Sequence, residues 1–91
     1  MDTKTKKAKL PPDPEHMNDD RADFAYDAAQ RFAARTGLNI EADGLDTAIS
    51  DLLADLAHLC DREGLELQGL LSRAEMHYVD ETNSKGKQFD I

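Results

Sequence analysis

Apolar residues at three- and four-residue spacing predict three amphipathic helices between residues 18 and 82. In the first helix the repeating positions are Phe24, Ala25, Ala28, Ala29 and Phe32, which fall on one helical face. The Asn-Asp-Asp segment at 18–20 offers N-cap side chains and carboxylates for the positive end of the helix dipole. Gly37 suits the left-handed position after a last turn. The pattern therefore predicts a helix over about 19–36.

The second apolar pattern is the strongest in the chain. Its members are Ile49, Leu52, Leu53, Leu56, Ala57, Leu59 and Cys60. They cover roughly 160° of a helix, which is wider than the stripe of an ordinary surface helix. We expect a central helix over about 46–63, ended by Gly64 with Leu65 folding back. Residues 38–45 are predicted to form a loop, with Leu38 and Ile40 tucked onto the core.

A third helix is predicted over about 66–82. Leu67, Leu70, Leu71, Ala74 and Tyr78 line its apolar face, whereas Met76 and Val79 are expected to point away from it. The short link around Gly64 makes an αα-hairpin with the preceding helix. Residues 1–17 and 83–91 carry all six lysines, all three prolines and Gly86, so both are predicted to be flexible tails. The expected fold is all-α, a small three-helix bundle with disordered N- and C-terminal tails.

Size and composition narrow this picture further. Hydrophobic residues make up 40% of the 91 residues but aromatic residues only 5%, which favours a small helical core over a sandwich or barrel. A bundle of about 65 residues lies near the lower limit of independent stability, so we expect a homodimer. The chain has no apolar run long enough for a membrane span and no signal-peptide pattern, which predicts a cytoplasmic protein.

The net charge of −8 is unevenly distributed. Residues 18–82 carry 15 acidic side chains against five arginines, a charge of −10, and contain no lysine. Such a body repels phosphates, so direct binding to nucleic acid is not expected. Two interpretations stay open: the acidity serves only solubility, or it presents an acidic surface to a basic surface of another protein.

If the acidic surface is functional, its partner-binding residues are expected on two helices. They are Asp19, Asp20, Asp23 and Asp27 on the first helix and Asp51 and Asp55 on the second. At 100° per residue the first four fall within roughly 100° of one another. The expected function is that of a non-enzymatic protein-interaction module.

Few side chains are placed for catalysis or metal binding. Asp55 and His58 are i,i+3 neighbours and form the only candidate metal pair, with Asp51 and Glu75 as further ligands in an alternative metal-binding enzyme or carrier. Alternatively, these residues belong to a solvent-exposed face of the helix whose charged side chains form ion pairs. Cys60 falls on the leucine face and is expected to be buried rather than nucleophilic. No phosphate-binding loop, zinc motif or nucleophile elbow is present, so neither an enzyme nor a cofactor is expected.

The remaining two histidines carry weaker signals. His77 borders the apolar face of the third helix, where a packed or hydrogen-bonded role is expected. His16 lies in the segment assigned to the N-terminal tail and is interpreted as part of a linker.

Three segments resemble a family of small, uncharacterised acidic proteins from proteobacterial plasmids, phages and genomic islands. They are Asp-Pro-Glu-His-Met-Asn-Asp-Asp-Arg-Ala at 13–22, Asp-Leu-Leu-Ala-Asp-Leu-Ala-His at 51–58 and Arg-Ala-Glu-Met-His-Tyr-Val-Asp-Glu-Thr at 73–82. The resemblance implies no activity. It places residues 16–18 inside a recurring segment and favours an accessory role on a mobile element. By analogy of size and charge, that role is an inhibitor, anti-CRISPR-like or nucleic-acid-mimicking, that binds a basic groove of a nuclease complex.

Overall fold

The computed structural model of the chain describes residues 13–82, and this part is helical without strands. Its helices are α1 (Met17–Thr36), α2 (Ile40–Asp43), α3 (Leu45–Glu63) and α4 (Leu67–Thr82). The three long helices match the predicted ones to within two residues at each end. The predicted tails at 1–12 and 83–91 lie outside the described residues.

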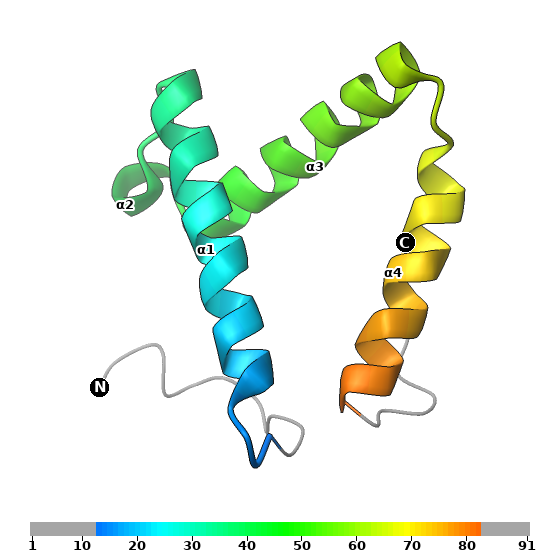
Figure 1. Cartoon of the computed structure of the whole chain (residues 1–91). Helices are drawn as coiled ribbons and strands as arrows, with labels where there is room; N and C mark the ends of the chain where they lie inside the picture. The colour runs from blue at the N-terminus through cyan, green and yellow to red at the C-terminus, as the bar shows by residue number, and fades with distance from the viewer. Residues whose placement is uncertain (1–12, 83–91) are drawn as a thin grey trace.

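The three long helices form the sides of a triangular frame (Figure 1). Helix α1 crosses the first half of α3, α4 follows α3 through a short link, and the last turn of α4 returns to the first turn of α1. Between these corners α1 and α4 lie apart. The all-α class is confirmed, but a closed three-helix bundle is not, because the helices meet at corners rather than along their lengths.

Small residues make the corner at which α1 crosses α3. Ala29 and Ala33 of α1 and Ala48 of α3 are almost completely buried, at 2%, 4% and 0% exposure. Methyl side chains allow two helix axes to approach closely. The predicted apolar face of α1 is therefore wrong in part: Ala29 is buried and Phe32 is half-buried, whereas Phe24 is 69% exposed and Ala28 is also exposed.

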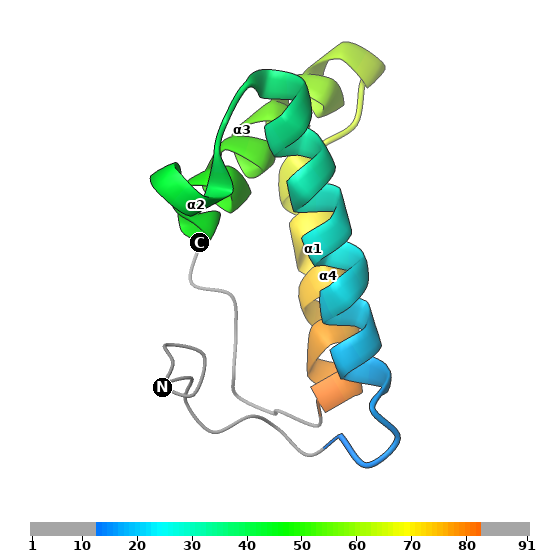
Figure 2. The same cartoon turned by 90° about the vertical axis from the view of Figure 1, so that its left-hand side faces the viewer.

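The segment between α1 and α3 is not simply the predicted loop, because it contains the short helix α2. Asn39 accepts a hydrogen bond on its side-chain oxygen from the Ala42 backbone N–H (3.0 Å), and its own N–H donates to the Asp43 carboxylate (3.0 Å). This reciprocal capping satisfies two of the free donors of the turn. The helix packs on α3 on the far side of α1 from α4 (Figures 1 and 2).

The second corner joins α3 to α4. Gly64 has a φ of +72° and its N–H donates to the carbonyls of Cys60 and Asp61, so it occupies the predicted left-handed position. The Leu65 N–H also donates to the Cys60 carbonyl (2.9 Å). Cys60 is buried at this corner, as predicted. On α4, Met76 is exposed as expected, whereas Val79 is half-buried, because the helix is rotated so that Val79 borders its inner face.

Helix α1 begins in a way that differs from the prediction. The Asp13 carboxylate accepts hydrogen bonds from the backbone N–H groups of Asn18 (3.1 Å) and Asp19 (3.0 Å), while His16 occupies the N-cap position with a φ of +60° and no capping side chain. Residues 13–17, assigned to the tail from the sequence, thus form a turn and the first residue of the helix. His16 belongs to this turn and not to a linker.

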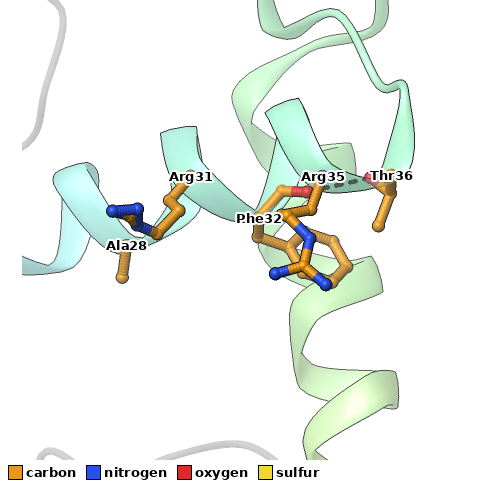
Figure 3. A pocket seen from close by; sticks show the side chains of 5 residues that line it. All are labelled: Ala28, Arg31, Phe32, Arg35 and Thr36. Carbon is orange, nitrogen blue, oxygen red and sulfur yellow. Dashed lines mark hydrogen bonds between the residues drawn. The ribbon is translucent and has the colours of Figure 1, made fainter.

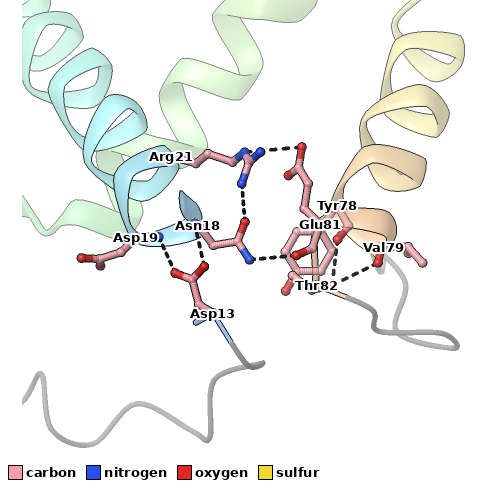
Figure 4. Close-up of polar contacts among 8 residues, drawn as sticks. All are labelled: Asp13, Asn18, Asp19, Arg21, Tyr78, Val79, Glu81 and Thr82. Atoms are coloured by element: carbon pink, nitrogen blue, oxygen red, sulfur yellow. Dashed lines mark hydrogen bonds and ion pairs between the residues drawn. The ribbon is translucent and has the colours of Figure 1, made fainter. Parts of the chain in front are cut away.

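The third corner is polar and joins α1 to α4 (Figure 4). The Asn18 side-chain amide donates to the Glu81 carbonyl at the end of α4 (2.9 Å), which satisfies one of the carbonyls that a helix end leaves free. Arg21 donates to the Asn18 side-chain oxygen (2.7 Å) and forms an ion pair with the Glu81 carboxylate (3.5 Å). Thr82, buried beside them, donates its hydroxyl to the Tyr78 carbonyl (2.7 Å).

Candidate interaction surfaces

The four aspartates of α1 share one face of the helix. Asp19, Asp20, Asp23 and Asp27 are all exposed, and by helical geometry they lie roughly 60–160° around the helix from the mean direction of Ala29 and Ala33, the alanines that pack on α3. Within residues 13–82 no arginine or histidine forms an ion pair with any of them. We call these four residues the acidic face. It is a strip of negative charge that runs along the first half of α1.

Asp51 and Asp55 lie on a different surface. Both are exposed on α3 and line a shallow hollow of about 220 Å³ together with Phe32, Thr36 and Leu38. Phe32 and Thr36 are on the opposite side of α1 from the acidic face. The structure therefore does not bring the six predicted aspartates into one site. Any partner that uses both groups must contact two sides of the molecule.

The Asp55–His58 pair has no third ligand nearby. Both residues are exposed on α3, and among the described residues no three His, Cys, Asp or Glu side chains are grouped so as to hold a metal ion. Glu75 is half-buried on α4 and makes its own interaction there. His77 is exposed rather than packed at the border of α4.

Another hollow lies along α1 and has a volume of about 470 Å³ (Figure 3). It is lined by Ala28, Arg31, Phe32, Arg35 and Thr36. The Thr36 hydroxyl donates to the Phe32 carbonyl (3.0 Å) within the same helix. None of the five lining side chains is a carboxylate, histidine or thiol, so this hollow offers neither a general base nor a nucleophile activated by one.

Five large aliphatic side chains on α3 are exposed to solvent, and four of them belong to the apolar arc predicted from the sequence. They are Leu45 (37%), Ile49 (44%), Leu53 (51%), Leu56 (39%) and Leu59 (42%), and we call them the leucine stripe. Within the predicted apolar arc only Cys60 is fully buried, and Leu52 and Ala57 are less exposed than the members of the stripe. In residues 13–82 no large side chain is completely buried. The periodic pattern identified the apolar face of α3, but it did not predict that this face would stay exposed.

The polar corner holds the residues that sequence reasoning missed. Asn18 and Arg21 were considered only as a cap and as part of the charge balance, and Glu81 was not singled out. Partial burial alone would raise the pKa of Asp13, but the backbone hydrogen bonds from Asn18 and Asp19, helped by the charges of His16 and Arg21, lower that pKa below its ordinary value. Nothing in the local sequence indicated that residues 63 positions apart would meet.

Comparison with known proteins adds no assignment: no protein-family model, curated protein or solved structure matches the chain. In the described part of the chain, no helix has both the length and the hydropathy that crossing a bilayer requires.

Proposed function

We propose that the chain is a non-enzymatic protein-interaction module whose acidic face binds a basic surface of a partner protein. The observation that carries the proposal is the exposure of four carboxylates on one side of α1, none of which forms an ion pair with another described residue. Such a strip favours lysines and arginines and accelerates their approach.

The spacing of the acidic face supports imitation of nucleic acid. Asp19 and Asp27 are separated by about 12 Å along the axis at 1.5 Å per residue, so the four charges occur about once every 4 Å. Phosphate charges on one DNA strand occur about every 3.4 Å along the duplex. In this proposal the protein is a mobile-element inhibitor that occupies a nucleic-acid-binding groove and competes with DNA or RNA for it.

The test removes the charges of the acidic face while leaving its shape. Immobilised wild-type protein and the variant Asp20→Asn/Asp23→Asn/Asp27→Asn are incubated with a proteobacterial cell extract, and bound proteins are quantified by mass spectrometry. We expect nucleic-acid-binding proteins on the wild type that an excess of duplex DNA releases, and their loss from the variant. Circular dichroism verifies that the variant remains helical.

A second variant controls for net charge. Asp61→Asn/Glu63→Gln/Asp80→Asn removes the same number of charges from exposed positions outside the acidic face. If both variants lose binding equally, only the total charge matters. If the acidic-face variant captures the same proteins as the wild type, the proposal is wrong.

The metal-binding alternative is not favoured by any contact in the structure, because Asp55 and His58 lack a third ligand among the described residues. Metal analysis of untagged protein tests it directly. A stoichiometric divalent metal that is lost in Asp55→Asn/His58→Gln would revive that alternative.

A further inference from the structure

The described chain lacks a hydrophobic core of its own. Its buried apolar residues are three alanines and Cys60, whereas ten large apolar side chains are 37–69% exposed. Globular domains bury their large aliphatic side chains because this burial is the main favourable contribution to folding. Something beyond residues 13–82 must cover this surface.

The remaining residues of the chain are poorly suited to that task. The 21 residues outside 13–82 include only four large apolar side chains, Met1, Leu10, Phe89 and Ile91, together with all six lysines. The leucine stripe alone has five exposed members, and it extends over 14 residues of α3, or about 21 Å. These 21 residues therefore offer too little apolar surface to cover the stripe.

The leucine stripe has the pattern and charge required for contact with a copy of itself. Its members fall within about 120° of the helix, and between Leu45 and Leu59 no charged residue lies inside that arc. Its members at 45, 49, 53, 56 and 59 are spaced by four, four, three and three residues, which keeps them on one side of the helix, as in helices that pack side by side. Two bodies of charge −10 repel each other wherever their acidic surfaces meet. The uncharged stripe is the surface on which they can approach without placing like charges in contact.

We infer that the leucine stripe of α3 packs against the leucine stripe of a second copy, and that the chain acquires its hydrophobic core in this homodimer. The acidic face lies on α1 and does not belong to the dimer contact. Each dimer then presents two acidic faces. A twofold interface of this kind is self-complementary, because the same patch serves both subunits.

Light scattering and thermal unfolding of the purified full-length protein test the inference. We expect a mass of twice 10.1 kDa and a melting temperature that rises with protein concentration over a roughly hundredfold range, as dimer-coupled folding requires. The variant Leu53→Glu/Leu56→Glu should give a monomer with reduced helicity. Because it could fail to fold, Leu53→Ala is measured as well, with an expected weakening of self-association of about tenfold or more.

The control is Met76→Glu, which places one such glutamate at an apolar position on α4 that is 67% exposed and outside the stripe. It should leave the mass and the concentration dependence unchanged. Three results would each overturn the inference: a folded wild-type monomer, a dimer that tolerates both stripe variants, or a chain that is unfolded alone and becomes helical only when a different protein is added.

Discussion

Replacing Ala33 by Leu should destabilise the protein strongly, whereas the same change at the next residue should have little effect. Ala33 is 4% exposed at the crossing of α1 and α3. Ala29 and Ala48, which form the same crossing, are also almost completely buried. A leucine side chain there has no space unless the helices separate, and overpacking of this kind costs about 1–3 kcal/mol. Ala34 is exposed, about 100° around α1 from Ala33, and Leu and Ala have similar helix propensities. Ala34→Leu should therefore change the free energy of unfolding by no more than about 0.5 kcal/mol.

The pair is compared by thermal unfolding monitored with circular dichroism at one protein concentration, so that association contributes equally. For a chain of this size, 1 kcal/mol corresponds to about 4–8 °C, so Ala33→Leu should lower the melting temperature by roughly 5–20 °C. Equal melting temperatures for Ala33→Leu and Ala34→Leu would refute the close crossing of α1 and α3. A large loss in both would indicate that Ala34 is covered as well.

Three further predictions concern the corners. The pKa of Asp13 is lowered in the folded protein, so the contribution of its carboxylate to stability is fully present above its unfolded pKa of about 3.8 and is lost as the pH falls through the lower folded value. The difference in melting temperature between wild type and Asp13→Asn should therefore shrink over that acidic range. A difference that stays constant would contradict the capping role of Asp13. Asn18→Ala should lower the free energy of unfolding, measured in urea, by about 0.5–1.5 kcal/mol. Arg21→Gln should lower it less, because its exposed ion pair contributes about 0–1 kcal/mol and weakens with salt. A larger loss for Arg21→Gln would show that the ion pair stabilises this corner more than the hydrogen bond of Asn18 does. Gly64→Ala should destabilise the protein by about 1–2 kcal/mol, because the φ of Gly64 is +72°. Gly69→Ala should stabilise it by about 0.5–1 kcal/mol, because Gly69 lies inside α4 and only the end of the flexible Glu66 side chain is near the added methyl group. The same thermal scans test whether the two effects have opposite signs.

The helices were predictable because the information that sets them is local. The three- and four-residue spacing of apolar residues identified α1, α3 and α4, and Gly37 and Gly64 marked the ends of α1 and α3, where both adopt positive φ values. Helix α2 was missed because four residues are too short for a periodic pattern and depend on the reciprocal hydrogen bonds of Asn39 and Asp43. The cap of α1 was misplaced because Asp13 reaches the helix from outside the usual N-cap position.

The arrangement of the helices, and hence of the candidate surfaces, was not predictable from periodicity. A hydrophobic pattern identifies which face of α3 is apolar, but not whether a helix of the same chain covers it, and Leu53 is 51% exposed. The contact of Asn18 with Glu81 depends on the lengths and directions of three helices together. The exposed positions of Asp20 and Asp23 agree with the expected polar side of α1, whereas their separation from Asp51 emerges only in three dimensions.

The triangular frame gives helix length an unusual role. Three rigid helices that contact one another at three points have fixed angles between them, even when each contact alone would allow rotation. With only two contacts, α1 and α4 could change their orientation relative to each other. The side chains of Asn18 and Arg21 that reach Glu81 supply the third joint. Adding or removing one helical turn, about 5.4 Å, in any one member would thus change all three crossing angles. The directions in which the two surfaces face are set by how long the helices are, as much as by how they pack.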